Sequence, residues 1–253
     1  TAYNTAVGYG AGQAVTTGVE NTILGGLAGD ALTDSDRNTA VGYAALTAET
    51  LGQYSTAVGY AALTSQANST ATNALNTAVG YNAGAAVTTG QQNTLIGGLA
   101  GDALTDADFN TAIGYQTLSA DTLGSRATAV GFQALANQNF TTATDSFNTA
   151  VGYHAGNDVT TGIQNTLIGG LVGDAITTAA ENTIMGYGAG SALTVGNNNA
   201  VLGSLALATD TKGDRNVAIG RGALYSQNFT TTTDSINTAI GYAAGEAVTT
   251  GIQ

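Results

Sequence analysis

Two clusters of aspartates have a spacing that could place several carboxylates around one cation. They comprise Asp30, Asp34 and Asp36, and Asp102, Asp106 and Asp108. Carboxylate oxygens gathered at a corner of the chain are ligands that Ca²⁺ accepts. The third equivalent segment keeps Asp174 but has Thr178 and Ala180 at the other two positions. We interpret the clusters as a solvated acidic edge, with calcium binding as the alternative.

Other residues that could do chemistry are scarce. The chain has no cysteine and one histidine, His154, which stands where other repeats carry Gly, Leu, Ala, Asn or Gln, so we interpret it as a surface variant. The runs "GYGAG" at Gly8 and "GGLAG" at Gly25 resemble phosphate-binding loops, but they recur without the strand-to-helix context that such loops need. We therefore expect no catalytic residue, no bound cofactor and no enzymatic activity.

Charge and hydropathy limit the partners. The 253 residues carry a net charge of −12 with only five Lys and Arg, which argues against nucleic acid and anionic membranes. No apolar run approaches the roughly 18 residues that span a bilayer. The chain starts at "TAY", which matches the tail of a repeat, and stops at Gln253, a repeat boundary, so we expect it to be a window on a longer array.

These residues must be positioned by a short repeat that fills the chain. "NTAVGYGAG" at Asn4 returns with small changes as "NTAVGYAAL" at Asn38 and "NTAIGYAAG" at Asn237. Successive repeats start 17 residues apart, or 21 apart after Ser55, Ala127 and Asn216. The starts fall at positions 4, 21, 38, 55, 76, 93, 110, 127, 148, 165, 182, 199, 216 and 237.

A period near 17 is too short for paired helices, and abundant Gly and Thr oppose helix formation. The period fits one coil of a β-solenoid. We predict an all-β fold, a parallel β-solenoid or β-roll in which residues 1–253 form a single array of about fourteen coils. Each coil should contain two short strands and two corners.

Each position of the repeat then has a structural interpretation. Position 1 is Asn in twelve repeats, which predicts a corner where stacked amides bond to neighbouring coils. Position 4 is always aliphatic, position 3 is always Ala, Ile, Leu or Val, and position 5 is always Gly. Since neither face of this strand is polar, we expect one face to pack inside the coil and the other to meet another copy of the chain. We assign positions 3 and 5 to the inter-chain face.

Positions 9 and 12 exchange residue types. Gly at position 9 is always accompanied by Val, Leu or Ile at position 12, whereas Leu at position 9 is accompanied by Glu, Asp or Gln. Because protein cores are closely packed, we expect the same space in the core to be filled by a side chain from either position, but not from both.

An aromatic column at position 6 is a candidate ladder for binding glycans or for contacts between chains. It comprises Tyr9, Tyr43, Tyr60, Tyr81, Tyr115, Phe132, Tyr153, Tyr187 and Tyr242.

The columns of Thr at positions 2 and 13 are compatible with an ice-binding surface, which needs ranks of exposed Thr side chains. The long repeats contain "NSTATNAL", "NFTTATDSF" and "NFTTTTDSI", each with an Asn-x-Thr triplet, at Asn68, Asn139 and Asn228. Turn formation explains these inserts, and glycosylation is the alternative.

The "NTA(V/I)GYxAL" string resembles the repeats of bacterial and phage surface fibres, which are tail-fibre-like and adhesin-like proteins. More distantly it is similar to the heads of YadA-like trimeric autotransporter adhesins. The resemblance covers essentially the whole chain and implies a parallel β-roll that is often left-handed and trimeric.

Together these observations predict a structural or adhesive extracellular fibre segment, homo-oligomeric and located at a cell surface or on a virion. The alternative is a carbohydrate-binding receptor fibre that recognises surface glycans with its long-coil loops. The third possibility is an ice-binding or calcium-dependent solenoid.

Overall fold

A computed structural model describes residues 2–252, and it is all-β, as predicted. None of the described residues forms a helix that could cross a membrane. The chain divides into two compact units. Unit 1 contains the residues up to Arg126 together with Thr141–Thr144, and unit 2 contains Ala127–Phe140 and the residues from Asp145 onward.

Each coil contributes one strand of three residues, made from repeat positions 2 to 4. In unit 1 these strands are β1 (Thr5–Val7), β2 (Thr22–Leu24), β3 (Thr39–Val41), β5 (Thr56–Val58), β7 (Thr77–Val79), β8 (Thr94–Ile96) and β9 (Thr111–Ile113). In unit 2 they are β11 (Thr128–Val130), β13 (Thr149–Val151), β14 (Thr166–Ile168), β15 (Thr183–Met185), β16 (Ala200–Leu202), β18 (Val217–Ile219) and β20 (Thr238–Ile240).

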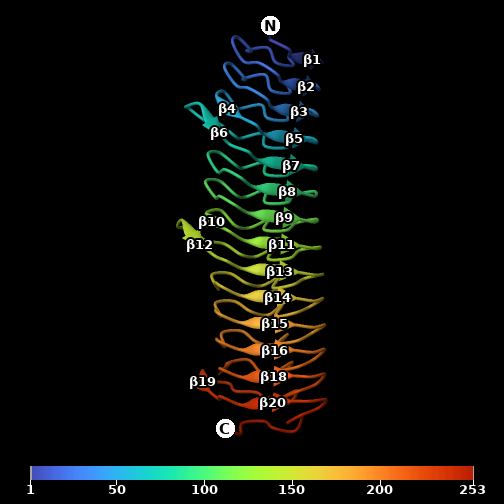
Figure 1. Cartoon of the computed structure of the whole chain (residues 1–253), viewed down its shortest axis with the longest axis vertical. Coiled ribbons are helices and arrows are strands. Elements are labelled where there is room, and N and C mark those ends of the chain that lie inside the picture. Colours follow the sequence, from blue (N-terminus) through green and yellow to red (C-terminus); the bar gives the residue numbers. More distant parts are fainter. Residues whose placement is uncertain (1, 253) are drawn as a thin grey trace. The chain divides into compact units, whose positions relative to one another are not determined.

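Within each unit the strands are parallel, in register and stacked in chain order (Figure 1). Thr5 pairs with Thr22 and Val7 with Leu24 in unit 1, and Thr149 pairs with Thr166 in unit 2. The solenoid with its 17-residue spacing is therefore confirmed. Among residues 2–252, the predicted second strand is missing from the 17-residue coils that do not precede a long coil, and turns close the circuit there instead.

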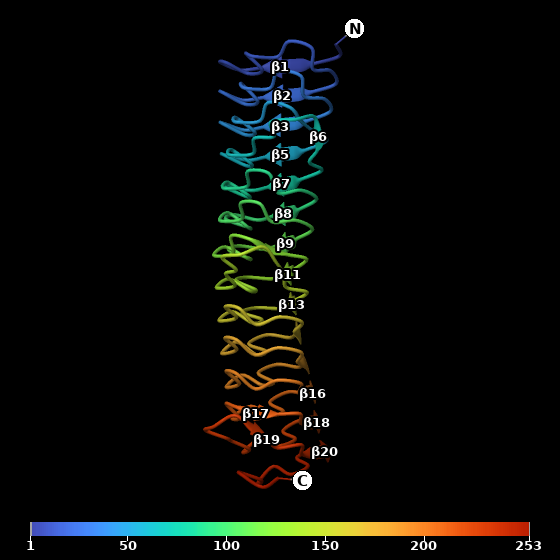
Figure 2. The ribbon, with the colours of Figure 1, turned by 90° about the vertical axis from the view of Figure 1, so that its left-hand side faces the viewer.

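Extra strands in the described chain occur in the three long coils and in the coil before each of them. They are β4 (Gly52–Gln53), β6 (Thr72–Asn73), β10 (Gly124–Ser125), β12 (Thr144–Asp145), β17 (Gly213–Asp214) and β19 (Thr233–Asp234). In unit 1, β4 and β6 pair in parallel on the side of the coil opposite the main strand row, and in unit 2 β17 pairs with β19. Figure 2 presents the side on which β17 and β19 lie. The four additional residues of a long coil thus build a small protruding sheet.

The core of each unit lies inside the coils and is filled from positions 3, 8, 9 and 12. Ala40 and Leu95 at position 3 are completely buried, whereas Leu24 at position 4 is 48% exposed. The assignment of positions 3 and 5 to an inter-chain face was therefore wrong. Side chains alternate along a strand, and it is position 3 that points inward while positions 2 and 4 point out.

Position 5 is glycine because of both backbone conformation and space. The φ angle at these residues lies between 126° at Gly220 and 143° at Gly80, a region that residues with a Cβ rarely adopt. A Cβ on Gly8 would lie 2.5 Å from the carbonyl oxygen of Gly25 in the next coil. The glycine column therefore permits the close approach of stacked coils.

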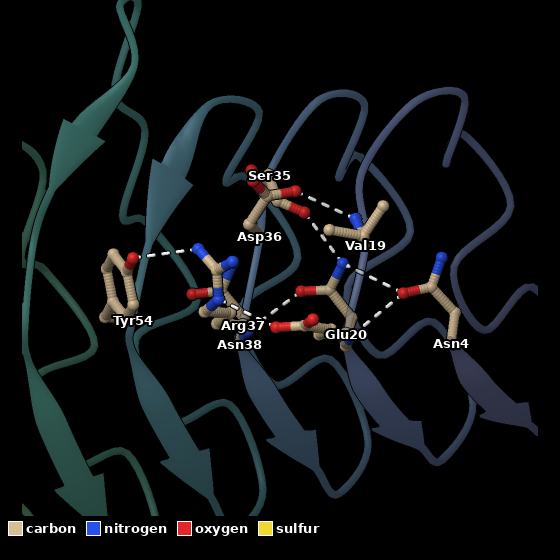
Figure 3. Close-up of polar contacts among 9 residues, drawn as sticks. Asn4, Val19, Glu20, Ser35, Asp36, Arg37, Asn38 and Tyr54 are labelled. Atoms are coloured by element: carbon tan, nitrogen blue, oxygen red, sulfur yellow. Dashed lines mark hydrogen bonds and ion pairs between the residues drawn. The ribbon is translucent and has the colours of Figure 1, made fainter. Parts of the chain in front are cut away.

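The asparagine column at position 1 is confirmed as a hydrogen-bonded corner (Figure 3). The Asn21 side chain donates to the carbonyl oxygen of Ser35 in its own coil at 2.7 Å. Its Oδ1 accepts the backbone N–H of Asn38, one coil further on, at 2.8 Å. Asn76 and Asn148 make the same pair of bonds in their own units. Because each amide satisfies two buried backbone groups, the column fixes the stacking of consecutive coils.

The exchange between positions 9 and 12 is also explained by packing. Leu46 at position 9 and Leu32 at position 12 are both completely buried. A Cβ added to Gly29 would lie only 2.6 Å from Cδ1 of Leu32, so a side chain at position 9 would occupy the same space. One core slot is thus filled from either of two positions.

Candidate functional site

The outer strand face runs along the row of strands in each unit. We use this name for the side chains at positions 2 and 4 of the strands. Position 2 is Thr in twelve coils, position 4 is aliphatic in all, and neither position ever carries a charge. Position 4 is exposed in some coils, as at Leu24 (48%), Ile96 (37%) and Leu202 (50%), and half-buried in others, as at Val58 and Val151. Each unit therefore presents a flat, in-register surface of aliphatic and threonine side chains.

This surface contrasts with the rest of the protein. The chain contains 17 Asp and Glu residues, and all of them lie outside the outer strand face. Water-exposed solenoid walls usually alternate polar with apolar side chains, and a contiguous apolar patch on a soluble protein commonly marks an interaction site. The absence of charge in both columns therefore makes the outer strand face a candidate interaction surface.

The aromatic column at position 6 is exposed and stacked. In unit 1 the rings of Tyr43, Tyr60 and Tyr81 follow one another at centroid distances of 5.5 and 5.6 Å, with interplanar angles of 18° and 17°. In unit 2, Phe132 stacks on Tyr153 at 5.5 Å. Where position 6 is glycine, the ring of the following coil lies over it, as Tyr43 does over Gly26. The column stabilises coil stacking while leaving aromatic surface accessible.

His154 belongs to this aromatic column. Its imidazole lies 4.2 Å from the Tyr153 ring and 5.6 Å from the Phe132 ring, centroid to centroid. Its Nε2 is buried and, within residues 2–252, has no hydrogen-bond partner. The residue is therefore more than a substituted surface position, because its imidazole packs against both rings.

The structure does not bring either aspartate cluster together as a cation site. Asp36 accepts the backbone N–H of Val19 at 2.8 Å, and Asp34 accepts the hydroxyl of Thr17 at 2.6 Å. Asp108 and Asp106 make the matching bonds to Gln91 and Thr89. Across the described residues, no three His, Cys, Asp or Glu side chains gather as metal ligands would. These carboxylates link neighbouring coils.

The first aspartate of each cluster has a different environment. Oδ1 of Asp30, Asp102 and Asp174 is buried and, within residues 2–252, has no hydrogen-bond partner. Burial raises the pKa of Asp102 and of Asp174 above the ordinary value for aspartate, because an ionised carboxylate is poorly solvated there. The same feature recurs in three equivalent coils.

The threonine column at position 13 is used within the coil stack. The hydroxyls of Thr16 and Thr33 donate to the carbonyl oxygens of Thr33 and Thr50 at 3.1 and 3.0 Å. Thr160 makes the corresponding bond to Thr177 in unit 2. These hydroxyls are hydrogen-bonded to the next coil, whereas an ice-binding surface needs rows of Thr hydroxyls that are free to contact ice.

The polar residues at position 12 before and within the long coils were not recognised as core residues. Glu49 is completely buried, and its Oε1 accepts backbone N–H groups from Thr50, Leu51, Gly52 and Asn68 at 2.6 to 3.1 Å. Its Oε2 accepts from the side chains of Gln66 and Asn68, both at 2.8 Å.

Unit 2 repeats this arrangement with a shorter acid. Asp210 accepts from the backbone of Gly213 and Phe229 and from the Gln227 side chain. Gln227 in turn accepts from Asn237 at 2.7 Å, as Gln66 does from Asn76 at 2.9 Å. A buried carboxylate saturated with donors therefore fixes the base of each of these two protruding sheets.

The Asn-x-Thr triplets are not equivalent in accessibility. Asn68 is 4% exposed and its amide nitrogen donates to Glu49, so it is not available for glycosylation. Asn139 and Asn228 are exposed. The difference arises because Asn68 lies one repeat position later than the other two asparagines.

A second set of exposed side chains lies at the last position of the coil, and the sequence analysis missed it. In unit 1, Arg37 is held between Glu20, at 2.7 Å, and the hydroxyl of Tyr54, at 2.8 Å (Figure 3). Arg126 lies over the ring of Phe109, with its Cζ 5.0 Å from the centroid. The sequence contained a signal for this set, since an aromatic residue or an arginine stands directly before several repeat starts.

No protein-family model matches the chain, and the searches of curated proteins and of solved structures also gave no match.

Proposed function

We propose that this chain is a structural or adhesive segment of an extracellular fibre, in which copies associate side by side through the outer strand face. The observation that carries this proposal is the pair of charge-free columns at positions 2 and 4, with exposed Leu24, Ile96 and Leu202. Covering this aliphatic surface would remove it from water, which favours association.

Electrostatics favours a second copy as the partner at this particular face. Every copy carries a net charge of −12, so two copies repel one another wherever acidic side chains meet. The outer strand face lacks acidic residues, and its repeat spacing is the same on every copy. Two such faces can therefore come together over many coils without burying an unpaired charge.

Two lysine substitutions test this proposal. Leu24→Lys in unit 1 and Leu202→Lys in unit 2 each place a charge in the proposed contact. Burial of an unpaired charge costs several kcal/mol, so we expect the association constant to fall about a hundredfold or more. Sedimentation velocity measures the mass, and circular dichroism should show an unchanged β-spectrum.

Thr161→Lys is the matched control, because Thr161 is exposed and lies outside the outer strand face. This variant should retain the mass of the wild-type assembly. A wild-type protein that stays a single chain at high concentration would contradict the proposal. Lysine variants that associate as strongly as Thr161→Lys would contradict it as well.

A further inference from the structure

Coil 13, which starts at Asn216, departs from the repeat on the side of the aromatic column. Position 6 is Arg221 instead of an aromatic residue, and no other coil has a charged residue there. Position 10 is Tyr225, whereas every other coil has a smaller, non-aromatic residue at that position. The aromatic ring has thus moved four residues along the coil, and an arginine stands in its place.

A hollow on the surface of unit 2 includes both Arg221 and Tyr225. Its volume is about 330 Å³, and it is lined by Leu205, Arg221, Gly222, Tyr225 and Glu246. Apart from Gly222 and its two chain neighbours, no residue has a heavy atom within 4 Å of the place where a Cβ on Gly222 would stand, so the glycine adds open space to the hollow. A volume of this order lies at the small end of the range for ligand sites.

The lining residues offer three kinds of recognition. The guanidinium of Arg221 has five N–H donors in a planar fork that matches a carboxylate. Within residues 2–252, its only side-chain hydrogen bond is a long one of 3.4 Å to the hydroxyl of Tyr242. Tyr225, 38% exposed, supplies a ring face, and the carboxylate of Glu246 accepts hydrogen bonds from hydroxyl groups.

We propose that this hollow binds a sugar acid, that is, a pyranose ring carrying a carboxylate. The ligand carboxylate pairs with Arg221, the apolar face of the ring lies on Tyr225, and ring hydroxyls donate to Glu246. A zwitterionic amino acid would also match Arg221 and Glu246 in charge. However, a small amino acid such as L-alanine has no ring to lie on Tyr225, whereas the apolar face of a pyranose does. The site is independent of chain association through the outer strand face.

Binding of D-galacturonate, measured by ligand-observed NMR on the whole chain, tests this proposal. We expect a dissociation constant in the millimolar range, with D-galactose binding at least tenfold more weakly because it lacks the carboxylate. Arg221→Gln and Tyr225→Ala should each weaken galacturonate binding about tenfold or more. Arg215→Gln is the control, because Arg215 pairs with Asp234 at 2.9 Å and does not line the hollow.

Three results would overturn the proposal. The first is no galacturonate binding at concentrations of tens of millimolar. The second is binding that Arg221→Gln leaves unchanged or that Arg215→Gln weakens equally. The third is equal or tighter binding of D-galactose, of acetate or of L-alanine. Since Arg221 is exposed, a retained β-spectrum for Arg221→Gln would show that a loss of binding does not come from unfolding.

Discussion

At the scale of single residues, the repeat fixes which side chains must stay constant. Asparagine at position 1 was predictable, because its amide can bond to two coils at a corner. Glycine at position 5 was recognised as constant but was assigned to an inter-chain face, whereas it lies where the backbones of adjacent coils approach each other. The role of Glu49 could not be predicted. An acidic residue in a repeat suggests solvent, and only the folded coil shows that it is buried among six donors.

Asp102 provides a residue-scale prediction about pH. Burial raises the pKa of its carboxyl, so the folded chain binds this proton more tightly than the unfolded chain does. The contribution of this carboxyl to stability is fully present when the pH lies below its pKa in the unfolded chain. It is lost as the pH rises through its pKa in the folded chain. Above that window the buried charge costs stability. Asp102→Asn should therefore raise the melting temperature at pH 7, because a neutral amide is less costly to bury than a carboxylate.

Thermal unfolding of wild type and Asp102→Asn between pH 3 and pH 7 measures this effect. The difference in melting temperature should shrink as the pH falls toward 3. Asp106→Asn is the control, because Asp106 accepts a hydrogen bond from Thr89 at 2.6 Å and its removal should bring no gain. A lower melting temperature for Asp102→Asn at pH 7 would show that its carboxylate is not penalised by burial.

At the scale of the element, the coil is held by core packing, by side-chain hydrogen bonds and by backbone hydrogen bonds that join its strands and turns to the next coil. The sequence predicted the strand at positions 2 to 4 from its β-branched residues, but not which face points inward, because both faces are apolar. Alternation alone allows either orientation. The folded coil shows the orientation, because position 3 is completely buried both where it is Ala, as at Ala40, and where it is Leu, as at Leu95.

The core slot shared by positions 9 and 12 supports a prediction for one coil. Leu46→Gly removes a completely buried side chain and should cost about 2–5 kcal/mol. Glu49→Val leaves the donors of Gln66 and Asn68 without an acceptor and should cost about 3 kcal/mol or more. In the double variant, the introduced valine side chain fills the space vacated by Leu46, so the combined cost should be smaller than the sum by about 1–3 kcal/mol.

Chemical denaturation of wild type, both single variants and the double variant gives this coupling energy. The double variant should remain less stable than wild type, because the hydrogen bonds to Glu49 are not restored. Leu46→Gly combined with Leu104→Ala is the control pair, since these residues fill slots in coils that are not adjacent, and their costs should add. Additive costs for Leu46→Gly and Glu49→Val would mean that the two positions do not share a slot.

At the scale of the whole molecule, the composition and the placement of charge lead to the proposed function. The 17 acidic and five basic residues are all kept away from positions 2 and 4, in each of the two units. The sequence led us to assign an inter-chain surface to positions 3 and 5, and the complete burial of Ala40 and Leu95 at position 3 overturns that assignment, so the interface that we now propose lies at positions 2 and 4. It could not identify the hollow at Arg221, because the replacement of one aromatic residue gains meaning only when Gly222 is seen to leave open space beside it.

Burial of the outer strand face in the assembled protein is the central claim, and thiol reactivity tests it most directly. The chain has no cysteine, so Leu202→Cys and Thr161→Cys each introduce a single thiol. Both positions are exposed on the isolated chain. In the assembly we expect the thiol at position 202 to react with a maleimide at least tenfold more slowly than the thiol at position 161. Dilution to the single chain should bring the two rates together. Equal rates at high protein concentration would contradict the claim that copies associate through this face.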